Sequence, residues 1–243
     1  MSEIFKERCL QKSYKTMLRL LDELDEALQR KGEDEAGLKR LLFGTDTLKP
    51  YEGQSDHSVC EGFDQKKASK ETREARIFKC LFFKNVDDDG IIRHCEDCAF
   101  RGKHDYTTQG EYKIVEYQVP AYYSNGNGDI GGIGEIDLVL QQGEDKFAVE
   151  VKPPHGNQDS LLRMIAEILT YTLGFPEGKY HKAIGFFKDS YQYQRYFESR
   201  EKYKVVKERI DRILKDEKIT VFCFERDEEK RVCKICKLYG PES

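Results

Sequence analysis

Asp137, Glu150 and Lys152 are the residues of this chain whose types and spacing could do chemistry. Two carboxylates held opposite one another on paired strands repel, and a divalent cation between them removes the repulsion. Water bound to such a cation loses a proton more easily and becomes a nucleophile, and a neighbouring ammonium stabilises developing negative charge. The three residues therefore predict a hydrolytic site for Mg²⁺ or Mn²⁺. The alternative is an exposed strand face that carries a ladder of Lys–Glu salt bridges.

A β-hairpin must bring these residues together. The stretches 134–140 and 147–152 read as strands, and the run between them is polar. Gly143 can adopt the positive φ of a two-residue loop. We therefore predict a hairpin with Gly143 and Glu144 as its loop.

This loop fixes which residues face one another. It places Asp137 opposite Glu150, and Glu135 opposite Lys152. Side chains alternate along a strand, so the other face of the first strand is predicted to be apolar and to carry Ile136, Leu138 and Leu140. Two acids and a lysine would then converge on one face of an otherwise apolar hairpin.

At these residues the chain resembles the PD-(D/E)XK nuclease superfamily. The pattern of that family is an Asp at a strand end, a hairpin, and Glu-x-Lys; here Asp137 and Glu150-Val151-Lys152 match it. The resemblance covers about residues 112–188. It implies a restriction-endonuclease-like fold and magnesium held by Asp137, Glu150 and the Val151 carbonyl. It also implies hydrolysis of phosphodiester bonds in DNA, and sometimes RNA. The Gly-x-x-Asp form that begins at Gly134 looks most like the RecB-like and Holliday-resolvase-like branches.

A helix is expected to follow the hairpin, from Asn157 or Gln158 to Leu173, with Asn157 or Asp159 as its cap. Its apolar residues recur at helical spacing and should form a buried stripe: Leu161, Leu162, Ile165, Ile168, Leu169 and Thr172.

A different face of this helix carries Arg163, Glu167 and Tyr171, which are spaced four apart. RecB-like nucleases have Gln-x-x-x-Tyr on the corresponding helix, near the metal and the DNA, and the resemblance gives these three side chains a nucleic-acid-binding or supporting role, together with Glu135. Glu167 stands where the family has Gln. The alternative is a surface Arg–Glu pair beside a half-buried tyrosine.

The remaining pattern predicts an α/β fold with a central mixed sheet flanked by helices and an N-terminal helical extension. Further strands are expected at 112–122, 181–188, 219–225 and 231–239, and a long helix at Tyr191–Lys215 that buries Phe197. Upstream helices are expected at Glu3–Arg30, Glu35–Phe43 and Ser69–Lys79. We divide the chain into the extension (1–48), a cysteine-containing insert (49–110) and the nuclease core (111–243).

Two roles of the upstream helices stay open. The extension either packs on the core or forms a partner-binding arm, and packing is the simpler expectation. In many members of the family a Glu on the helix before the sheet joins the metal site. Glu71 and Glu74 are the candidates here, and it is also open that neither of them joins the metal site.

Eight cysteines are many for a chain in a reducing compartment, where metal sites are commoner than disulfides. One candidate zinc site has the four thiols Cys60, Cys80, Cys95 and Cys98. Some RecB-like exonucleases hold an iron–sulfur cluster on four cysteines, for which this chain offers Cys223, Cys233, Cys236 and an earlier one such as Cys95. Small buried thiols are the alternative for Cys9, Cys80 and Cys223.

Composition bounds the partners. The formal net charge is −4, so the chain has no general basic footprint for nucleic acid, although basic residues cluster at 101–104 and 202–215. A signal peptide and a membrane helix are not evident, and a cytoplasmic protein without membrane contact is expected. The resemblance to the nuclease family also implies that the chain forms a homodimer or joins a larger complex in repair or anti-phage defence. The alternatives to a Mg²⁺-dependent deoxyribonuclease are a non-catalytic nucleic-acid- or protein-binding module that retains the fold, and a cluster-bearing exonuclease.

Overall fold

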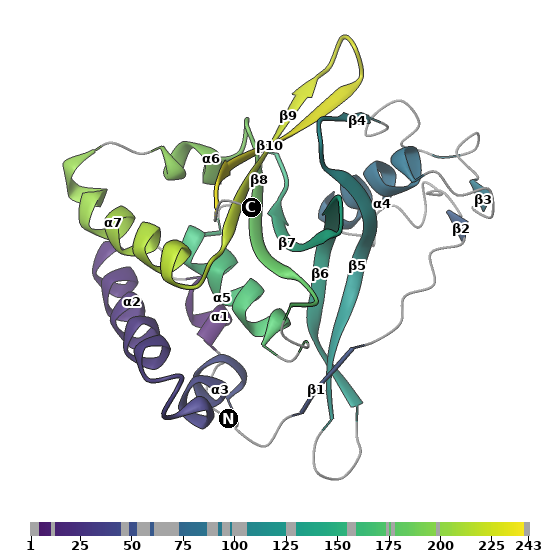
Figure 1. The fold of residues 1–243 in the computed structure, drawn as a ribbon. Helices are drawn as coiled ribbons and strands as arrows, with labels where there is room; N and C mark the ends of the chain where they lie inside the picture. Colours follow the sequence, from purple (N-terminus) through teal and green to yellow (C-terminus); the bar gives the residue numbers. More distant parts are fainter. Residues whose placement is uncertain are drawn as a thin grey trace.

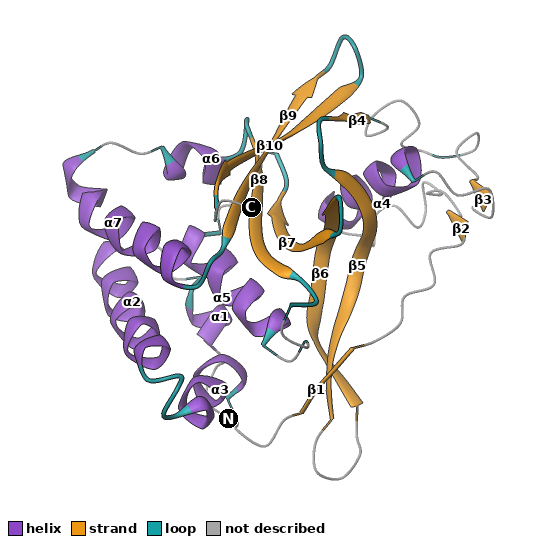
Figure 2. Ribbon diagram, viewed as in Figure 1, coloured by secondary structure: helices purple, strands orange, loops and turns teal. Residues whose placement is uncertain are grey.

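The computed structural model describes residues 5–10, 13–44, 49–52, 59–60, 73–86, 92–93, 98, 106–124, 130–154, 159–173, 175, 178–197 and 200–240. Side chains of a few residues within these ranges, including 122–124 and 130–133, lie outside the described set. In the described part, helices and strands follow one another along the chain in the order that the sequence pattern predicts, and most of the strands form one large sheet (Figure 1, Figure 2).

The sheet is mixed and strongly curled, with eight strands in the order β1-β5-β6-β7-β8-β9-β10-β4. Strands β7, β8 and β9 run parallel, β4 runs parallel to β10, and the remaining neighbours are antiparallel. The strands are β1 (Lys49–Glu52), β4 (Thr107–Gln109), β5 (Lys113–Ser124), β6 (Ile130–Gln142), β7 (Asp145–Lys152), β8 (His181–Phe187), β9 (Thr220–Asp227) and β10 (Val232–Tyr239). Two short strands, β2 (Val59–Cys60) and β3 (Ile92–Arg93), pair separately.

Helices cover both faces of the sheet. One face packs on α4 (Arg73–Asn85). The other face carries the remaining helices, which Figure 1 shows on the side opposite α4. These are α1 (Phe5–Arg8), α2 (Tyr14–Gln29), α3 (Glu35–Phe43), α5 (Leu161–Thr172), α6 (Tyr191–Tyr196) and α7 (Glu201–Asp216).

The hairpin register is confirmed over its described ladder. Gln142 pairs with Asp145, the pairing continues to Leu138 and Val149, and Gly143 has the predicted positive φ, 59°. One facial assignment is wrong. Leu138 and Leu140 pack toward α4, but Ile136 packs in the opposite core.

The neighbouring strand makes the same switch. Gln118 of β5, between Tyr117 and Val119, has a φ of 46°, outside the range of regular strands. Tyr117 pairs with Leu138 in one core, and Val119 pairs with Ile136 in the other. Simple alternation fails where the sheet curls.

Several predicted helix boundaries need correction. The predicted helix Glu3–Arg30 is two helices, because Ser13 accepts a hydrogen bond from the Thr16 amide and starts α2 as an N-cap. Helix α4 continues past Lys79 to Asn85, since its aromatic residues face the sheet. The predicted helix Tyr191–Lys215 is also interrupted, and Phe197 at the end of α6 is 52% exposed rather than buried.

The N-terminal helices pack on the core, in agreement with the simpler expectation. The apolar residues of α2 and α3 join the cluster that α5 and α7 form on the sheet. Arg209 of α7 donates to Asp22 and Asp25 of α2, and Arg212 also contacts Asp25. This part of the predicted basic cluster at 202–215 is therefore used within the molecule; the cluster at 101–104 lies outside the described residues.

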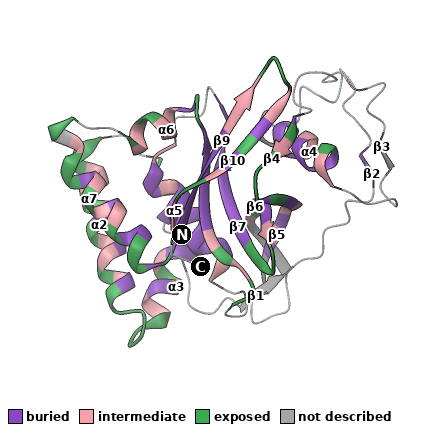
Figure 3. Cartoon of the chain, turned by 45° about the horizontal axis from the view of Figure 1, so that its top comes forward, coloured by how far each residue is buried: buried purple, intermediate pink, exposed green. Residues whose placement is uncertain are grey.

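Burial follows the layers. In Figure 3 the central strands and α5 are buried, and exposed residues lie on the outer sides of α2 and α7. Helix α5 is buried nearly all round, because the sheet covers one side of it and the N-terminal helices cover the other. Among the described residues, no helix has the length and apolar character needed to cross a membrane.

Glu217, directly after α7, joins the N-terminal helices to the sheet. Its buried carboxylate accepts from Lys182 at 2.8 Å and from Lys31. Burial alone would raise the pKa of Glu217, but the two lysines outweigh burial and lower it. A carboxylate with a lowered pKa stabilises the fold at neutral pH, and this contribution is lost as the pH falls through the folded-state pKa.

We expect Glu217→Gln to lower the free energy of unfolding at pH 7 by about 1–3 kcal/mol, since hydrogen bonds to charged groups contribute about that much. The difference from wild type should begin to shrink below about pH 4.5, where the carboxyl of the unfolded wild-type chain takes up a proton, and it should be lost as the pH falls through the lowered folded-state pKa. Urea denaturation at pH 7 and pH 4 measures both. Glu208→Gln, an exposed change on the same region of α7, should have little effect. A pH-independent difference would contradict the ionic role.

Candidate active site

Strand β7 directs Glu150 and Lys152 toward α5. The two residues are two apart on the strand and therefore point to the same side. Their parallel partners on β8, Ile184 and Phe186, belong to the core that contains α5. Glu150 and Lys152 are each 3% exposed, which is unusual for charged groups and requires compensation within the protein.

Asp137 reaches the same region from β6. Its Oδ2 accepts a hydrogen bond from the Val151 backbone amide at 2.7 Å, directly beyond the last described pair of the β6–β7 ladder. Asp137 lies close enough to Glu150 to raise its pKa by charge repulsion. The predicted meeting of the two acids is therefore supported by the geometry.

Glu135 has a different position from the predicted one. Its backbone partner is Pro120 on β5, and the ladder toward β7 has already ended, so it does not lie opposite Lys152. Glu135 is exposed and Asp137 is partly exposed. The buried cluster therefore reaches solvent along this end of β6.

Lys152 is the centre of an ion network. Its ammonium nitrogen lies 2.6 Å from Glu150 Oε1, 3.1 Å from Glu167 Oε2 and 3.8 Å from Asp159 Oδ2. The lysine thus bridges a strand acid and two acids from the α5 region. The alternative of an exposed Lys–Glu ladder does not describe this arrangement, because the side chains of Lys152, Glu150 and Glu167 are each 4% exposed.

Helix α5 supplies the second half of the network. Ser160 caps its first turn through the Arg163 amide, so the predicted cap Asp159 is wrong and Asn157 lies outside the described residues. Arg163 donates to Glu167 at 2.8 Å and lies 3.4 Å from Asp159. Arg163, Glu167 and Tyr171 do share a face, as predicted, but that face is covered rather than open to solvent.

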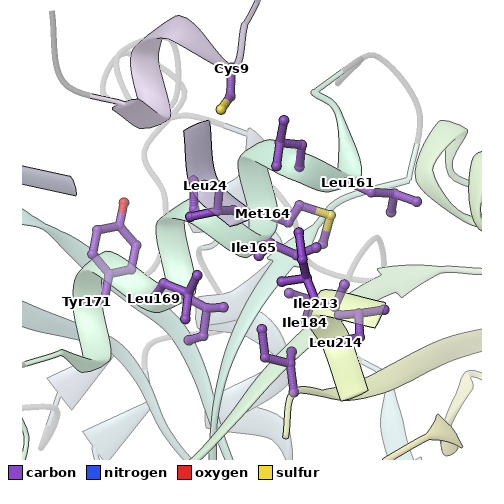
Figure 4. Packing of buried hydrophobic residues seen from close by; sticks show 14 of the residues in the cluster. Cys9, Leu24, Leu161, Met164, Ile165, Leu169, Tyr171, Ile184, Ile213 and Leu214 are labelled. Carbon is purple, nitrogen blue, oxygen red and sulfur yellow. The ribbon is translucent and has the colours of Figure 1, made fainter. Parts of the chain in front are cut away.

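Tyr171 fixes the approach of α5 to β6. A Cβ atom added to Gly134 would lie 2.4 Å from the Tyr171 ring and its hydroxyl, and Gly134 has a φ of 144°. Glycine is therefore required here by space and by backbone conformation. Figure 4 shows the Tyr171 ring on α5 away from the aliphatic cluster around Ile165 and Ile213. The Gly-x-x-Asp pattern thus has a packing reason.

The buried acids Glu150 and Glu167 can lie close together only because protons or positive charges offset their repulsion. Burial and the nearby charge of Asp137 raise the pKa of Glu150 well above its usual range. Burial would also raise the pKa of Glu167, but the charges of Lys152 and Arg163 outweigh it and lower it. A proton on Glu150 would let this residue donate to Glu167. The pair therefore needs either a shared proton or another cation when both groups ionise.

The donor set can accept a divalent cation. Glu150 Oε2 is buried and receives no hydrogen bond from the described residues, and the buried Glu167 Oε2 has the Lys152 ammonium 3.1 Å away as its ion-pair partner. Within those residues, no three His, Cys, Asp or Glu side chains already converge as ligands around one point. Magnesium needs only one or two carboxylates and keeps several waters, so Asp137 and Glu150 satisfy its requirements. The ligand role of the Val151 carbonyl stays a prediction.

The cysteine sites receive no support from the described residues. Cys95 lies outside them, and Cys60, Cys80 and Cys98 belong to no group of described side chains that could hold a metal ion. Cys223 of β9 and Cys236 of β10 are opposite one another in the backbone ladder. Burial raises the pKa of the Cys233 thiol to about 12 and that of the Cys223 thiol to about 11. Such thiols stay protonated, and the described part contains no Cys-containing group arranged to hold a metal. The side chains of Glu71 and Glu74 also lie outside it.

Sequence reasoning missed two members of the cluster. The sequence pattern marks Asp159 only as a helix cap, and no motif includes Lys6. Lys6 lies on α1, is 8% exposed and donates to the Tyr171 hydroxyl at 3.2 Å. The available signal was Ser13: as a helix start it separates a short first segment, in which Phe5 and Cys9 are buried apolar anchors. A lysine beside such an anchor can be buried with it.

Comparison of the chain with protein-family models, curated proteins and solved structures found no significant match.

Proposed function

We propose that this chain is a metal-dependent nuclease of the PD-(D/E)XK type that hydrolyses phosphodiester bonds, with DNA as the substrate. The observation that carries the proposal is the buried acid pair Glu150 and Glu167 beside Asp137. Like charges at this depth are retained where a function needs them, because apolar residues would pack there at lower cost. The Asp…Glu-x-Lys order and the hairpin geometry agree with the resemblance.

Each residue has a role in this proposal. Asp137 and Glu150 would hold Mg²⁺ or Mn²⁺, which supplies an activated water and neutralises charge on the scissile phosphate. Lys152, held by three acids, would orient that water and stabilise negative charge as it develops. Glu167 and Arg163 keep the ammonium of Lys152 in position, and Tyr171 keeps α5 at its distance from β6. Solvent and substrate would approach along the exposed end of β6, at Glu135.

The test is incubation with linear, circular and single-stranded DNA and with RNA, with and without Mg²⁺ or Mn²⁺. We expect cleavage that requires the cation and stops with a chelator. Glu150→Gln should be inactive, because the neutral amide is a poor ligand for a hard cation. Absence of cleavage on every substrate, together with absence of Mn²⁺ binding by calorimetry, would rule the proposal out.

A second function is favoured by one observation. Lys152 already neutralises much of the charge of Glu150 and Glu167, so the network can also persist as a buried structural element. The chain would then be a binding module that retains the nuclease fold. Such a module would bind no Mn²⁺ through Glu150, and the same calorimetric titration separates the two functions. A role in repair or defence complexes rests on the family resemblance alone.

A further inference from the structure

Helix α1 places a second ammonium group beside the acids. Lys6 Nζ lies 3.2 Å from the Tyr171 hydroxyl and 4.8 Å from the centre of its ring. The negative charges of Glu167, Glu7 and Glu150 favour its ammonium form. Tyr171 shares its face of α5 with Glu167, the ion-pair partner of Lys152, so Lys6 borders the cluster around Lys152 although the two lysines are far apart in the sequence.

The position of Lys6 is fixed by strong anchors. Phe5 and Cys9 on either side of it are 0% and 1% exposed. Ser160, the cap of α5, donates to the Cys9 carbonyl at 3.2 Å, and Arg8 is paired with Glu23 of α2. Figure 4 shows Cys9, directly after α1, near the start of α5. Because α1 packs in the core, it holds Lys6 beside Tyr171.

A buried ammonium needs negative charge nearby. Burial lowers the pKa of Lys6, and Glu167 is the main opposing charge. In this structure the acids of the cluster compensate Lys6, Lys152 and Arg163. Once those carboxylates also neutralise a bound divalent cation, less of their charge remains for Lys6, and an anion becomes its natural partner. Phosphate is the anion that the proposed reaction brings to this place.

We infer that Lys6 is a phosphate-binding residue of the site, whose ammonium holds a non-bridging oxygen of the substrate phosphate. A compact ammonium binds phosphate as a point charge. Tyr171 positions it through the hydroxyl contact. This inference rests on the proposed nuclease function and adds a residue from the N-terminal extension that the Asp…Glu-x-Lys motif does not contain.

The test compares three variants. Lys6→Met keeps the approximate length of the side chain and removes its charge, Lys6→Arg keeps the charge, and Lys15→Met is the control at an exposed lysine of α2. Cleavage of a DNA substrate gives kcat and KM, and calorimetry without DNA gives the Mn²⁺ affinity. We expect Lys6→Met to lose about 10²-fold in kcat/KM, as removal of one donor to a developing charge does. Its Mn²⁺ affinity should be unchanged or tighter, because a repelling charge is gone. Lys6→Arg should retain part of the activity, and Lys15→Met all of it.

Three outcomes would overturn the inference. Wild-type kcat/KM in Lys6→Met would show that the ammonium binds no phosphate. Higher activity would make α1 an inhibitory cover. If Lys6→Met lowers the activity, the Mn²⁺ affinity and the folded fraction together, the role of Lys6 is structural. If Lys6→Met does not fold, the wild-type protein is studied instead by NMR of its lysine ¹³Cε atoms. The Lys6 resonance should shift as a non-cleavable phosphorothioate duplex binds. A resonance that does not shift overturns the inference.

The failure of this inference is distinguishable from failure of the nuclease function. If the wild-type protein cleaves DNA and Lys6→Met cleaves equally well, only the role of Lys6 falls. If the wild type neither binds Mn²⁺ nor cleaves any substrate, the nuclease function falls and the role of Lys6 falls with it.

Discussion

Replacing Asp137 by asparagine is expected to abolish metal-dependent cleavage and leave the fold intact. Asparagine keeps a side-chain oxygen that can accept the hydrogen bond from the Val151 amide, so the local backbone loses little. It removes the negative charge that a hard cation requires. The loss in kcat/KM should exceed the about 10–100-fold that removing an outer partner of a metal ligand costs. Cleavage assays and a thermal melt measure the two effects.

The matched control is Glu144→Gln in the loop of the same hairpin, where the side chain is exposed. It removes one negative charge from the hairpin without touching the cluster, and both activity and melting temperature should stay at the wild-type level. Full activity in Asp137→Asn would refute its role as a metal ligand. A large fall in melting temperature would show instead that the carboxylate charge supports the fold.

Lys152 is a less clean target than Asp137. Its ammonium compensates Glu150, Glu167 and Asp159 in a buried place. Removing it would leave buried acids without their cation, and breaking such a pair typically costs about 3–5 kcal/mol. Lost activity in Lys152→Ala would therefore combine chemistry with stability, and Asp137→Asn separates the two.

The second large effect is expected for Gly134→Ala. The added methyl group would overlap the Tyr171 ring, and alanine is strained at a φ of 144°. Overpacking costs about 1–3 kcal/mol and a strained backbone about 1–3 kcal/mol, so we expect a loss of about 2–6 kcal/mol in the free energy of unfolding. Urea denaturation measures this loss.

A double-mutant cycle tells the two causes apart. Tyr171→Ala removes the ring that the new methyl group meets, so Gly134→Ala should cost at least about 1 kcal/mol less in that background. Gly143→Ala in the hairpin loop is the control for backbone strain, because its φ is 59° and nothing lies near its added Cβ. Equal costs with and without the Tyr171 ring would contradict the steric explanation.

The sequence predicted the hairpin well because its information is local. Gly143 sets the turn, the turn sets the register, and the register brings Asp137 to Glu150. The strand and helix order from β5 to β10 follows from patterns of the same kind. Helix breaks at Ser13 and after Tyr196 were less visible, since the apolar period continues across them.

The depth of the cluster was not predictable from the pattern. The apolar stripe of α5 indicates one buried face, and Glu167 and Tyr171 lie on another. That face is buried because β6 and β7 cover it from the sheet and because α1 and α3 pack on the helix from a part of the chain more than a hundred residues away. Lys6 belongs to the site for the same reason. The position of Glu135 was wrong because the two strands separate beyond Leu138.

Burial of α5 on both sides makes the hairpin and the N-terminal helices depend on each other. Loss of the first 43 residues would turn one side of α5 into an apolar surface in contact with water, and surfaces of that kind promote aggregation. The smallest unit that could carry the proposed chemistry therefore includes the short first helix as well as the motif.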